Sequence, residues 1–190
     1  LDLQVRLNNK YGFSSDKVLK ITQDLREKHK AITYNRSDCR YLTDDQFNEA
    51  PQTLDFLTDL FPELPKEQVD KTKKGRAFNA NKVTAHTAII PVTGKYQLND
   101  FTQDELKVFT EIATQYFIQF LPEKSYQQVT AIVACNGYQF KTTATKTLNH
   151  GWSKLVADDE VEDPNKQIAL SEARRIEPDF EVGEDCSEHI

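Results

Sequence analysis

A long helical pattern of apolar residues ends at a proline in the middle of the chain. Apolar side chains recur at helical spacing from Leu106 to Phe120, directly after the stretch "TQDE" (102–105). A threonine followed three residues later by a glutamate is typical of a capping box at a helix N-terminus. Pro122 cannot continue the helix, because its ring removes a backbone donor and clashes with the preceding turn. The pattern predicts a core helix of about five turns that ends near residue 121.

The sequence changes character after this proline and becomes rich in β-branched and aromatic residues. The runs "SYQQVTAIVAC" (125–135) and "YQFKTTATKT" (138–147) flank Asn136-Gly137, a pair typical of two-residue hairpin turns. Two further short strands and an acidic loop are expected in "HGWSKLV" (150–156), "IEPDFEVGEDC" (176–186) and "EVEDPNKQ" (160–167). A helical part followed by a β-rich part predicts an α+β fold.

Shorter helical patterns precede the long helix. Ser14 or Ser15 is a candidate N-cap for a helix whose apolar stripe includes Val18, Ile21 and Leu25, and which should end near 28–30. The capping-box spacing of "TDDQ" (43–46) predicts a short helix, and Pro51 is expected to open another one. The polar stretch 64–82 is expected to be a surface loop with at most one helical turn.

Composition narrows the class of protein. No apolar run approaches the roughly 20 residues that cross a bilayer. The three cysteines are widely spaced and form no CxxC pair, which favours a reduced, cytoplasmic setting over a disulfide framework or a zinc site. The sequence lacks methionine and starts at Leu1, so we expect a segment of a longer protein.

Charge is distributed unevenly along the chain. Residues 157–190 hold twelve acids and three basic residues, a net −9; the whole chain carries −6, so residues 1–156 carry +3. The stretch from Lys71 to Lys82 is the most cationic. A weakly positive module can bind a phosphate backbone where its charges cluster, although a run of lysines is more often a solvated face.

The stretch "ITYNRSDCRYL" (32–42) is the first candidate for chemistry. A tyrosine phenol is almost entirely protonated at neutral pH and needs a base, a cation or a polarised target to act as a nucleophile. Arg36 follows Tyr34 by two residues, so in extended backbone both side chains lie on the same side. A guanidinium matches the oxygens of a phosphate, and Asp38 continues the same row and could orient it. The alternative interpretation is that Tyr34 is an ordinary packed or surface residue without a catalytic role.

His86, in "KVTAHTAIIPV" (82–92), is the second candidate. Histidine can donate to a phosphate oxygen or relay a proton near neutral pH. A single histidine is more often only hydrogen-bonded at a surface.

These two stretches carry a family resemblance. The first resembles the active-site tyrosine motif of type IA DNA topoisomerases, usually T-Y-[PM]-R-[ST]-D. The second resembles the family's A-H-x-A-I-x-P-T motif, in the form typical of the topoisomerase III branch. The long helix and the later "GW" follow that branch in order and spacing, so the resemblance covers about residues 3–156.

The resemblance implies a role for each matching residue. Tyr34 matches the nucleophile that becomes a 5′-phosphotyrosine, and Arg36 the arginine at the scissile phosphate. His86 matches the histidine that contacts DNA or helps proton transfer. Further DNA-binding residues are expected at Ser37, Asp38 and Lys82.

The resemblance also implies an organisation. Residues 1–121 would form a helical domain with the active-site tyrosine and a DNA-binding loop, and residues 122–190 a β-rich segment of the family's arch, or hinge, with an acidic tail. The expected partner is single-stranded DNA in the cytoplasm, at the nucleoid, with no membrane or small-molecule substrate. Mg²⁺ is the implied cofactor. The family binds it in an N-terminal Toprim domain upstream of this region, so no metal ligand is assigned here, and the chain alone is expected to be inactive.

Three positions depart from the family pattern. Asn35 stands where proline or methionine is usual, Thr87 where His or Glu is common, and Val92 where Thr is common.

Two other classes of function stay open. One is a non-catalytic module that binds single strands through the stretch 71–82 and aromatic side chains. The other is a helical domain for protein contacts in which Tyr34 is structural.

Overall fold

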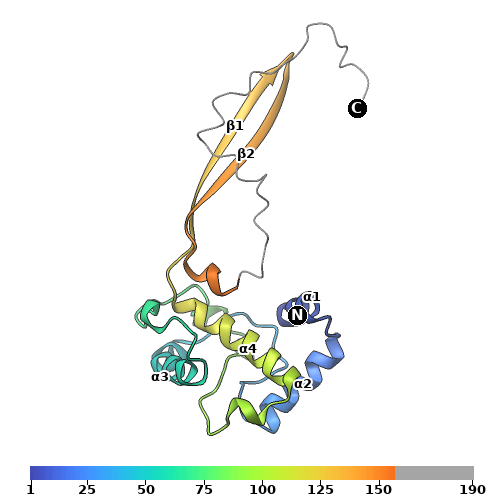
Figure 1. Ribbon diagram of the computed structural model, residues 1–190, viewed down its shortest axis with the longest axis vertical. Helices are drawn as coiled ribbons and strands as arrows, with labels where there is room; N and C mark the ends of the chain where they lie inside the picture. The colour runs from blue at the N-terminus through green and yellow to red at the C-terminus, as the bar shows by residue number, and fades with distance from the viewer. Residues whose placement is uncertain (157–190) are drawn as a thin grey trace. The chain divides into compact units, whose positions relative to one another are not determined.

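The computed structural model describes residues 1–156, apart from the side chain of Cys135. It contains a helical unit, formed by Leu1–Lys124 with the described residues from Asn149 onward, and a separate hairpin unit, Ser125–Leu148. The α-helices are α1 (Asp2–Tyr11), α2 (Ser15–Glu27), α3 (Asp44–Leu60) and α4 (Gln103–Phe117), and the strands are β1 (Ser125–Cys135) and β2 (Tyr138–Asn149) (Figure 1). None of the helices within 1–156 combines the length and the apolar character that a membrane span requires. The mixture of helix and strand confirms the α+β class.

Helix α4 is the centre of the helical unit, with α1 and α2 on one side and α3 on the other (Figure 1). It begins where the sequence predicted, because the Thr102 hydroxyl accepts from the amide of Glu105 and the Glu105 carboxylate accepts from the amide of Thr102. It ends in a 3₁₀ turn, Ile118–Phe120, just before Pro122. The predicted core helix is confirmed.

Helix α2 is also confirmed, with the Ser14 hydroxyl as its N-cap and Lys28 as its C-cap. Helix α1 packs against α2 and α4 and buries Leu7, although no pattern in the sequence had singled it out.

The expectation of two helices around Pro51 is wrong. Helix α3 runs unbroken from Asp44 to Leu60 with Pro51 inside it. The proline leaves one carbonyl of the first turns without its helical donor. The helix continues because the residues on both sides of Pro51 are buried in the core, among them Ala50, Leu54 and Leu57. Packing therefore outweighs the local cost of the proline.

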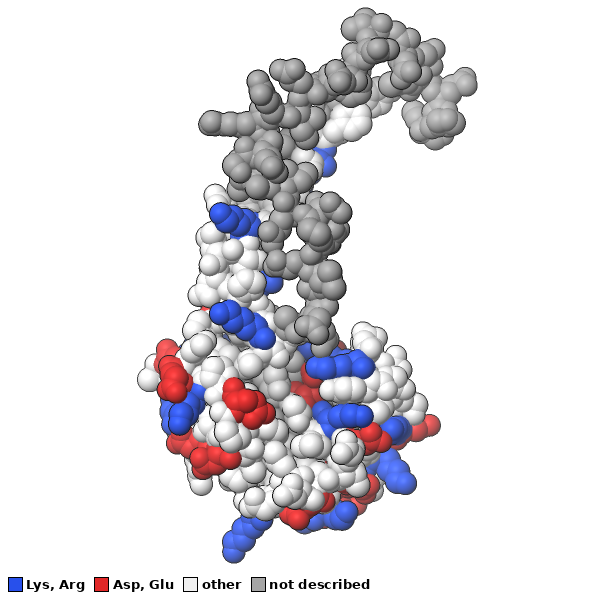
Figure 2. Space-filling view, viewed as in Figure 1, with Lys and Arg blue, Asp and Glu red and all other residues white. Residues whose placement is uncertain are grey.

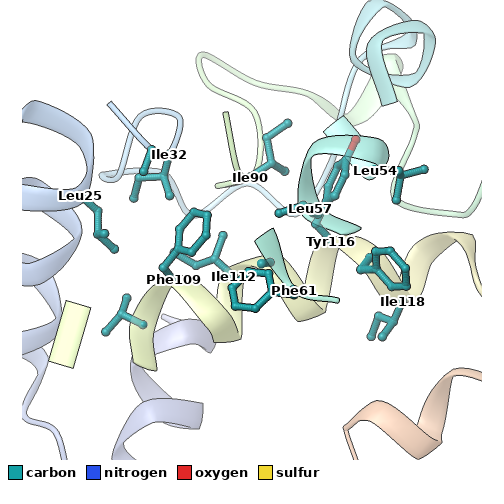
Figure 3. Close-up of a cluster of buried hydrophobic side chains, with 14 of the residues drawn as sticks. Leu25, Ile32, Leu54, Leu57, Phe61, Ile90, Phe109, Ile112, Tyr116 and Ile118 are labelled. Atoms are coloured by element: carbon teal, nitrogen blue, oxygen red, sulfur yellow. The ribbon is translucent and has the colours of Figure 1, made fainter. Parts of the chain in front are cut away.

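Apolar side chains from all four helices form one core (Figure 3). Phe109 of α4 lies at its centre, with ring centroids 5.3 Å from Phe101, 5.7 Å from Tyr96 and 6.1 Å from Phe61. Leu25 of α2 and Leu54 of α3 approach the same cluster from opposite sides in Figure 3. Aromatic contacts thus hold the segment that contains Tyr96 and Phe101 against helix α4.

A buried acid joins α4 to the end of α2. The Glu105 carboxylate lies 3.2 Å from the Nε2 atom of His29, and both side chains are more than nine-tenths buried. The His29 ring also packs edge-on against Phe101. Burial raises the pKa of the Glu105 carboxyl, but the hydrogen bonds from Thr102 and the contact with His29 outweigh this effect and leave the pKa below its ordinary value of 4.5.

This lowered pKa predicts a pH dependence of stability. A carboxyl whose pKa is lowered by folding stabilises the fold above its unfolded pKa and loses that contribution as the pH falls through its folded pKa. We expect Glu105→Gln, which keeps an acceptor for the Thr102 amide, to lower the free energy of unfolding at pH 7. The difference from wild type should shrink as the pH is lowered below about 4.5. Urea titrations between pH 3 and pH 7 measure it, and a difference that does not change with pH would contradict the assignment.

The hairpin unit has the predicted two-residue turn. Asn136 and Gly137 both have positive φ, 48° and 83°, as the tight turn between two twisted strands requires. The strand expected in 150–156 is wrong, because Gly151–Leu155 forms a 3₁₀ helix. Gly151 has φ 48°, and a Cβ there would collide with the backbone of Pro122 and Glu123. The expected acidic loop and last strand, 160–167 and 176–186, lie outside the described residues.

Candidate functional site

The site is built on the pairing of two chain segments, which we call the tyrosine loop (residues 31–42) and the histidine segment (residues 84–92). Ile32 forms an antiparallel bridge with Pro91. The amide of Thr33 donates to the carbonyl of Ile90 at 3.0 Å, and the amide of Val92 donates to that of Ala31 at 2.8 Å. Farther along, the amide of Ala88 donates to the carbonyl of Tyr41 at 2.9 Å. The two motifs are therefore held in register by backbone hydrogen bonds.

This pairing places Tyr34 beside His86, fifty-two positions away in the sequence. Their ring centroids are 4.3 Å apart and their planes are tilted by 44°. Tyr34 is half-buried and His86 is exposed. The Tyr34 ring is thus held against His86 and remains partly exposed to solvent.

A second group covers the Tyr34 ring. The guanidinium carbon of Arg26, on the last turn of α2, lies 4.5 Å from the ring centroid. Sequence reasoning missed Arg26, because it lies in a charged helical run and its position over the ring depends on how the chain turns after α2. A cation at this distance from an aromatic face makes an attractive contact with the ring.

Asn35 anchors the loop beneath the tyrosine. Its side chain is 8% exposed, and its Nδ2 atom donates to the Thr22 hydroxyl of α2 at 3.3 Å. Thr22 in turn donates to the carbonyl of Leu19. This departure from the family pattern therefore has a structural explanation, since a buried hydrogen bond holds the loop where the family uses proline or methionine.

Thr87, another departure, also has a local partner. Its hydroxyl accepts from the Nε2 atom of Gln46 at 3.2 Å, and Gln46 belongs to the capping box of α3. The N-terminus of α3 therefore fixes the histidine segment.

The other predicted residues lie on the same loop or next to it. Arg36 and Asp38 are exposed, and the Ser37 hydroxyl accepts from the amide of Cys39 at 3.2 Å. Ser37 and Asp38 line a hollow of about 660 Å³ that the loop forms with α1 and α4. The ammonium of Lys82 lies over the ring of Tyr41 at 5.1 Å and donates to its hydroxyl at 3.4 Å.

Much of the cationic stretch 71–82 is engaged within the protein. Lys71 pairs with Asp55 at 2.5 Å, Lys74 pairs with Asp44 at 2.8 Å, and Lys73 donates to the carbonyl of Leu121. Figure 2 shows basic and acidic side chains interspersed over the helical unit on the face in view. This arrangement does not favour 71–74 as a separate nucleic-acid site.

Residues 1–156 contain no group of three or more His, Cys, Asp or Glu side chains arranged to hold a metal ion.

Comparison with known proteins decides the family. A family model described as DNA topoisomerase matches residues 1–187. The chain belongs to the DNA topoisomerase family. It is 36% identical over 155 residues to DNA topoisomerase 3 of Vibrio cholerae, covering 80% of this chain and 24% of that protein. It is 34% identical over 169 residues to DNA topoisomerase 3 of Salmonella typhimurium, covering 88% and 26%. These relatives place the topoisomerase chain in the topoisomerase III branch of the type IA group.

A solved structure shares the fold of this topoisomerase chain. Full-length topoisomerase I of Thermotoga maritima superposes with a TM-score of 0.54 at 23% identity, covering 82% of this chain and 26% of that one. The chain spans about a quarter of the length of the curated relatives that it matches.

Proposed function

We propose that Tyr34 is the nucleophile of a type IA topoisomerase that cleaves single-stranded DNA transiently, passes a strand through the break and reseals it. The observation that carries this proposal is the half-buried Tyr34 ring held against His86 and under the Arg26 guanidinium by the paired motifs.

Cleavage is a transesterification. The Tyr34 oxygen bonds to the phosphorus as the bond from phosphorus to the 3′ oxygen breaks, which leaves a 5′-phosphotyrosine and a free 3′-hydroxyl. The phenol loses one proton and the 3′ oxygen gains one. The phosphoester bond is conserved, so the reverse attack by the 3′-hydroxyl reseals the strand without ATP.

The neighbouring side chains take distinct roles in this proposal. Arg36, exposed two residues from Tyr34, binds the scissile phosphate through its fork of donors. His86 donates to a phosphate oxygen or transfers a proton at the reacting atoms. Ser37, Asp38 and Lys82 contact the adjoining DNA, and Asn35 keeps the loop on α2.

We assign magnesium to the family's Toprim domain; residues 1–156 contain no group of three or more His, Cys, Asp or Glu side chains arranged to hold a metal ion. No step above passes through a metal held by this chain. The hairpin and the residues that follow it are assigned to the hinge of the arch, and the enzyme to the cytoplasm, at the nucleoid.

A hybrid enzyme tests the proposal. The matched quarter of Vibrio cholerae DNA topoisomerase 3 is replaced by this chain, and the hybrid is incubated with labelled single-stranded DNA and magnesium, then denatured. We expect a covalent protein–DNA adduct and relaxation of negatively supercoiled plasmid by the hybrid, and neither from the 190-residue chain alone. A folded hybrid that binds DNA without forming the adduct would favour a non-catalytic binding module.

A further inference from the structure

Some lysines of the helical unit are held in ion pairs, and others are not. Lys17, Lys71 and Lys74 each lie within 3 Å of an aspartate oxygen. Within residues 1–156, in contrast, Lys28, Lys30 and Lys95 are in no ion pair. An exposed cation without a carboxylate partner is available to a phosphate, whereas a paired one must first give up its partner.

These unpaired cations line two adjoining hollows. A hollow of about 450 Å³ is lined by Arg26, Lys30, Ile32 and Val92, together with Glu27. A second, of about 700 Å³, shares Lys30 and Val92 with the first and extends along 93–96, past Lys28 and Lys95. We call the continuous depression the α2 groove. Arg26 lines the first hollow and its guanidinium also covers the Tyr34 ring, so one side chain connects the groove to the proposed nucleophile.

Two acids line the groove as well, and both have partners of their own. Glu27 accepts from the Nε2 atom of Gln23 at 3.3 Å, and Asp100 accepts from the amide of Gln97 at 2.9 Å. With Arg26 and the three lysines, the lining remains net positive.

The backbone at Lys30 is unusual. Lys30 and Asn136 are the two non-glycine residues with positive φ in 1–156, and Asn136 belongs to the hairpin turn. The chain must turn sharply there, because the amide of Ala31 returns to the carbonyl of Leu25 at 2.8 Å. Glycine suits this conformation better than lysine. The residue at this position is nevertheless a lysine, and Lys30 lines both hollows.

We propose that the α2 groove holds the backbone of the DNA strand that continues from the nucleotide at Tyr34. This inference rests on the proposed function, and adds a path for the strand that runs along the C-terminal end of α2 rather than along the stretch 71–74. The two aromatic rings that line the groove, those of His29 and Tyr96, are both more than nine-tenths buried, and the Tyr96 hydroxyl donates to the carbonyl of Val92. With no exposed ring for base stacking, the groove binds phosphates and tolerates any base sequence.

The test measures binding of a fluorescein-labelled oligothymidylate to the 190-residue chain by anisotropy at increasing salt concentration. The variant is Lys28→Gln/Lys30→Gln/Lys95→Gln, and the matched control is Lys17→Gln/Lys71→Gln/Lys74→Gln, which removes the same charge from paired lysines. Each phosphate contact on a single strand contributes about −0.7 to the slope of log K against log salt. We expect the groove variant to lose about 2 units of slope and the control to keep the wild-type slope.

A single substitution separates the loss of a phosphate contact from a loss of folding. Lys30→Gly suits the positive φ and removes the ammonium, so we expect an unchanged or raised melting temperature together with a slope that is smaller by about 0.7. Three results would contradict the proposal that the α2 groove binds DNA. They are equal slopes for the triple groove variant and its control, an unchanged slope for Lys30→Gly, and no salt-dependent binding by wild type. The proposed function fails separately, through the adduct assay on the hybrid enzyme, which uses none of these variants.

Discussion

Replacing Tyr34 with phenylalanine in the hybrid enzyme is expected to abolish the covalent protein–DNA adduct. Phenylalanine keeps the ring that packs between His86 and Arg26, so the loop should retain its structure. The substitution removes only the phenol oxygen, which is the proposed nucleophile. The adduct, detected as labelled DNA that remains on the denatured protein, should fall below detection while DNA binding stays within about twofold, a change of only about 0.4 kcal/mol.

Tyr41→Phe is the matched control for this prediction. Tyr41 lies on the same tyrosine loop and also contacts a cation, Lys82, but its hydroxyl accepts a hydrogen bond from that lysine and its ring lies apart from the His86–Arg26 frame. We expect Tyr41→Phe to form the adduct. An adduct in the Tyr34 variant, or its loss only in the Tyr41 variant, would move the nucleophile to another residue.

Phe109→Ala is expected to destabilise the helical unit by about 3–5 kcal/mol, the usual cost of deleting a buried aromatic side chain. Phe109 is fully buried and touches the rings of Phe61, Tyr96 and Phe101. Its removal leaves a cavity where three elements meet. Urea unfolding followed by the helical circular dichroism signal measures the change.

Phe140→Ala provides the comparison, because the Phe140 side chain is 62% exposed on β2. We expect its effect on the unfolding of the helical unit to stay within about 0.5 kcal/mol. If Phe109→Ala cost less than about 1 kcal/mol, the typical cost of any substitution, the aromatic cluster would not be the centre of the core.

The predictions that held concern features encoded over a few neighbouring residues. The capping box at Thr102 and the apolar spacing behind it specify α4 through its own hydrogen bonds and one buried face. Asn136-Gly137 specifies the hairpin turn, because both residues tolerate positive φ. The two motifs were recognisable for a similar reason, since each is a short run of letters, and the comparisons confirm the family that they indicated.

The failures arose where distant contacts outweighed local preference. Pro51 lies inside α3 because the core holds the residues around it. The stretch at Gly151 is a 3₁₀ helix rather than a strand because the amide of Trp152 donates to the carbonyl of Pro122, thirty positions earlier.

The environment of Tyr34 shows the same division. Tyr34 was recognisable as a candidate nucleophile from a motif of five or six adjoining residues. Its neighbours were not, because Arg26 reaches the ring through the left-handed turn at Lys30, and His86 reaches it through backbone hydrogen bonds between segments more than fifty positions apart. Spacing along a chain specifies helices and turns, whose partners are near in sequence. Groups that converge on one phenol depend on where the packed core places each segment.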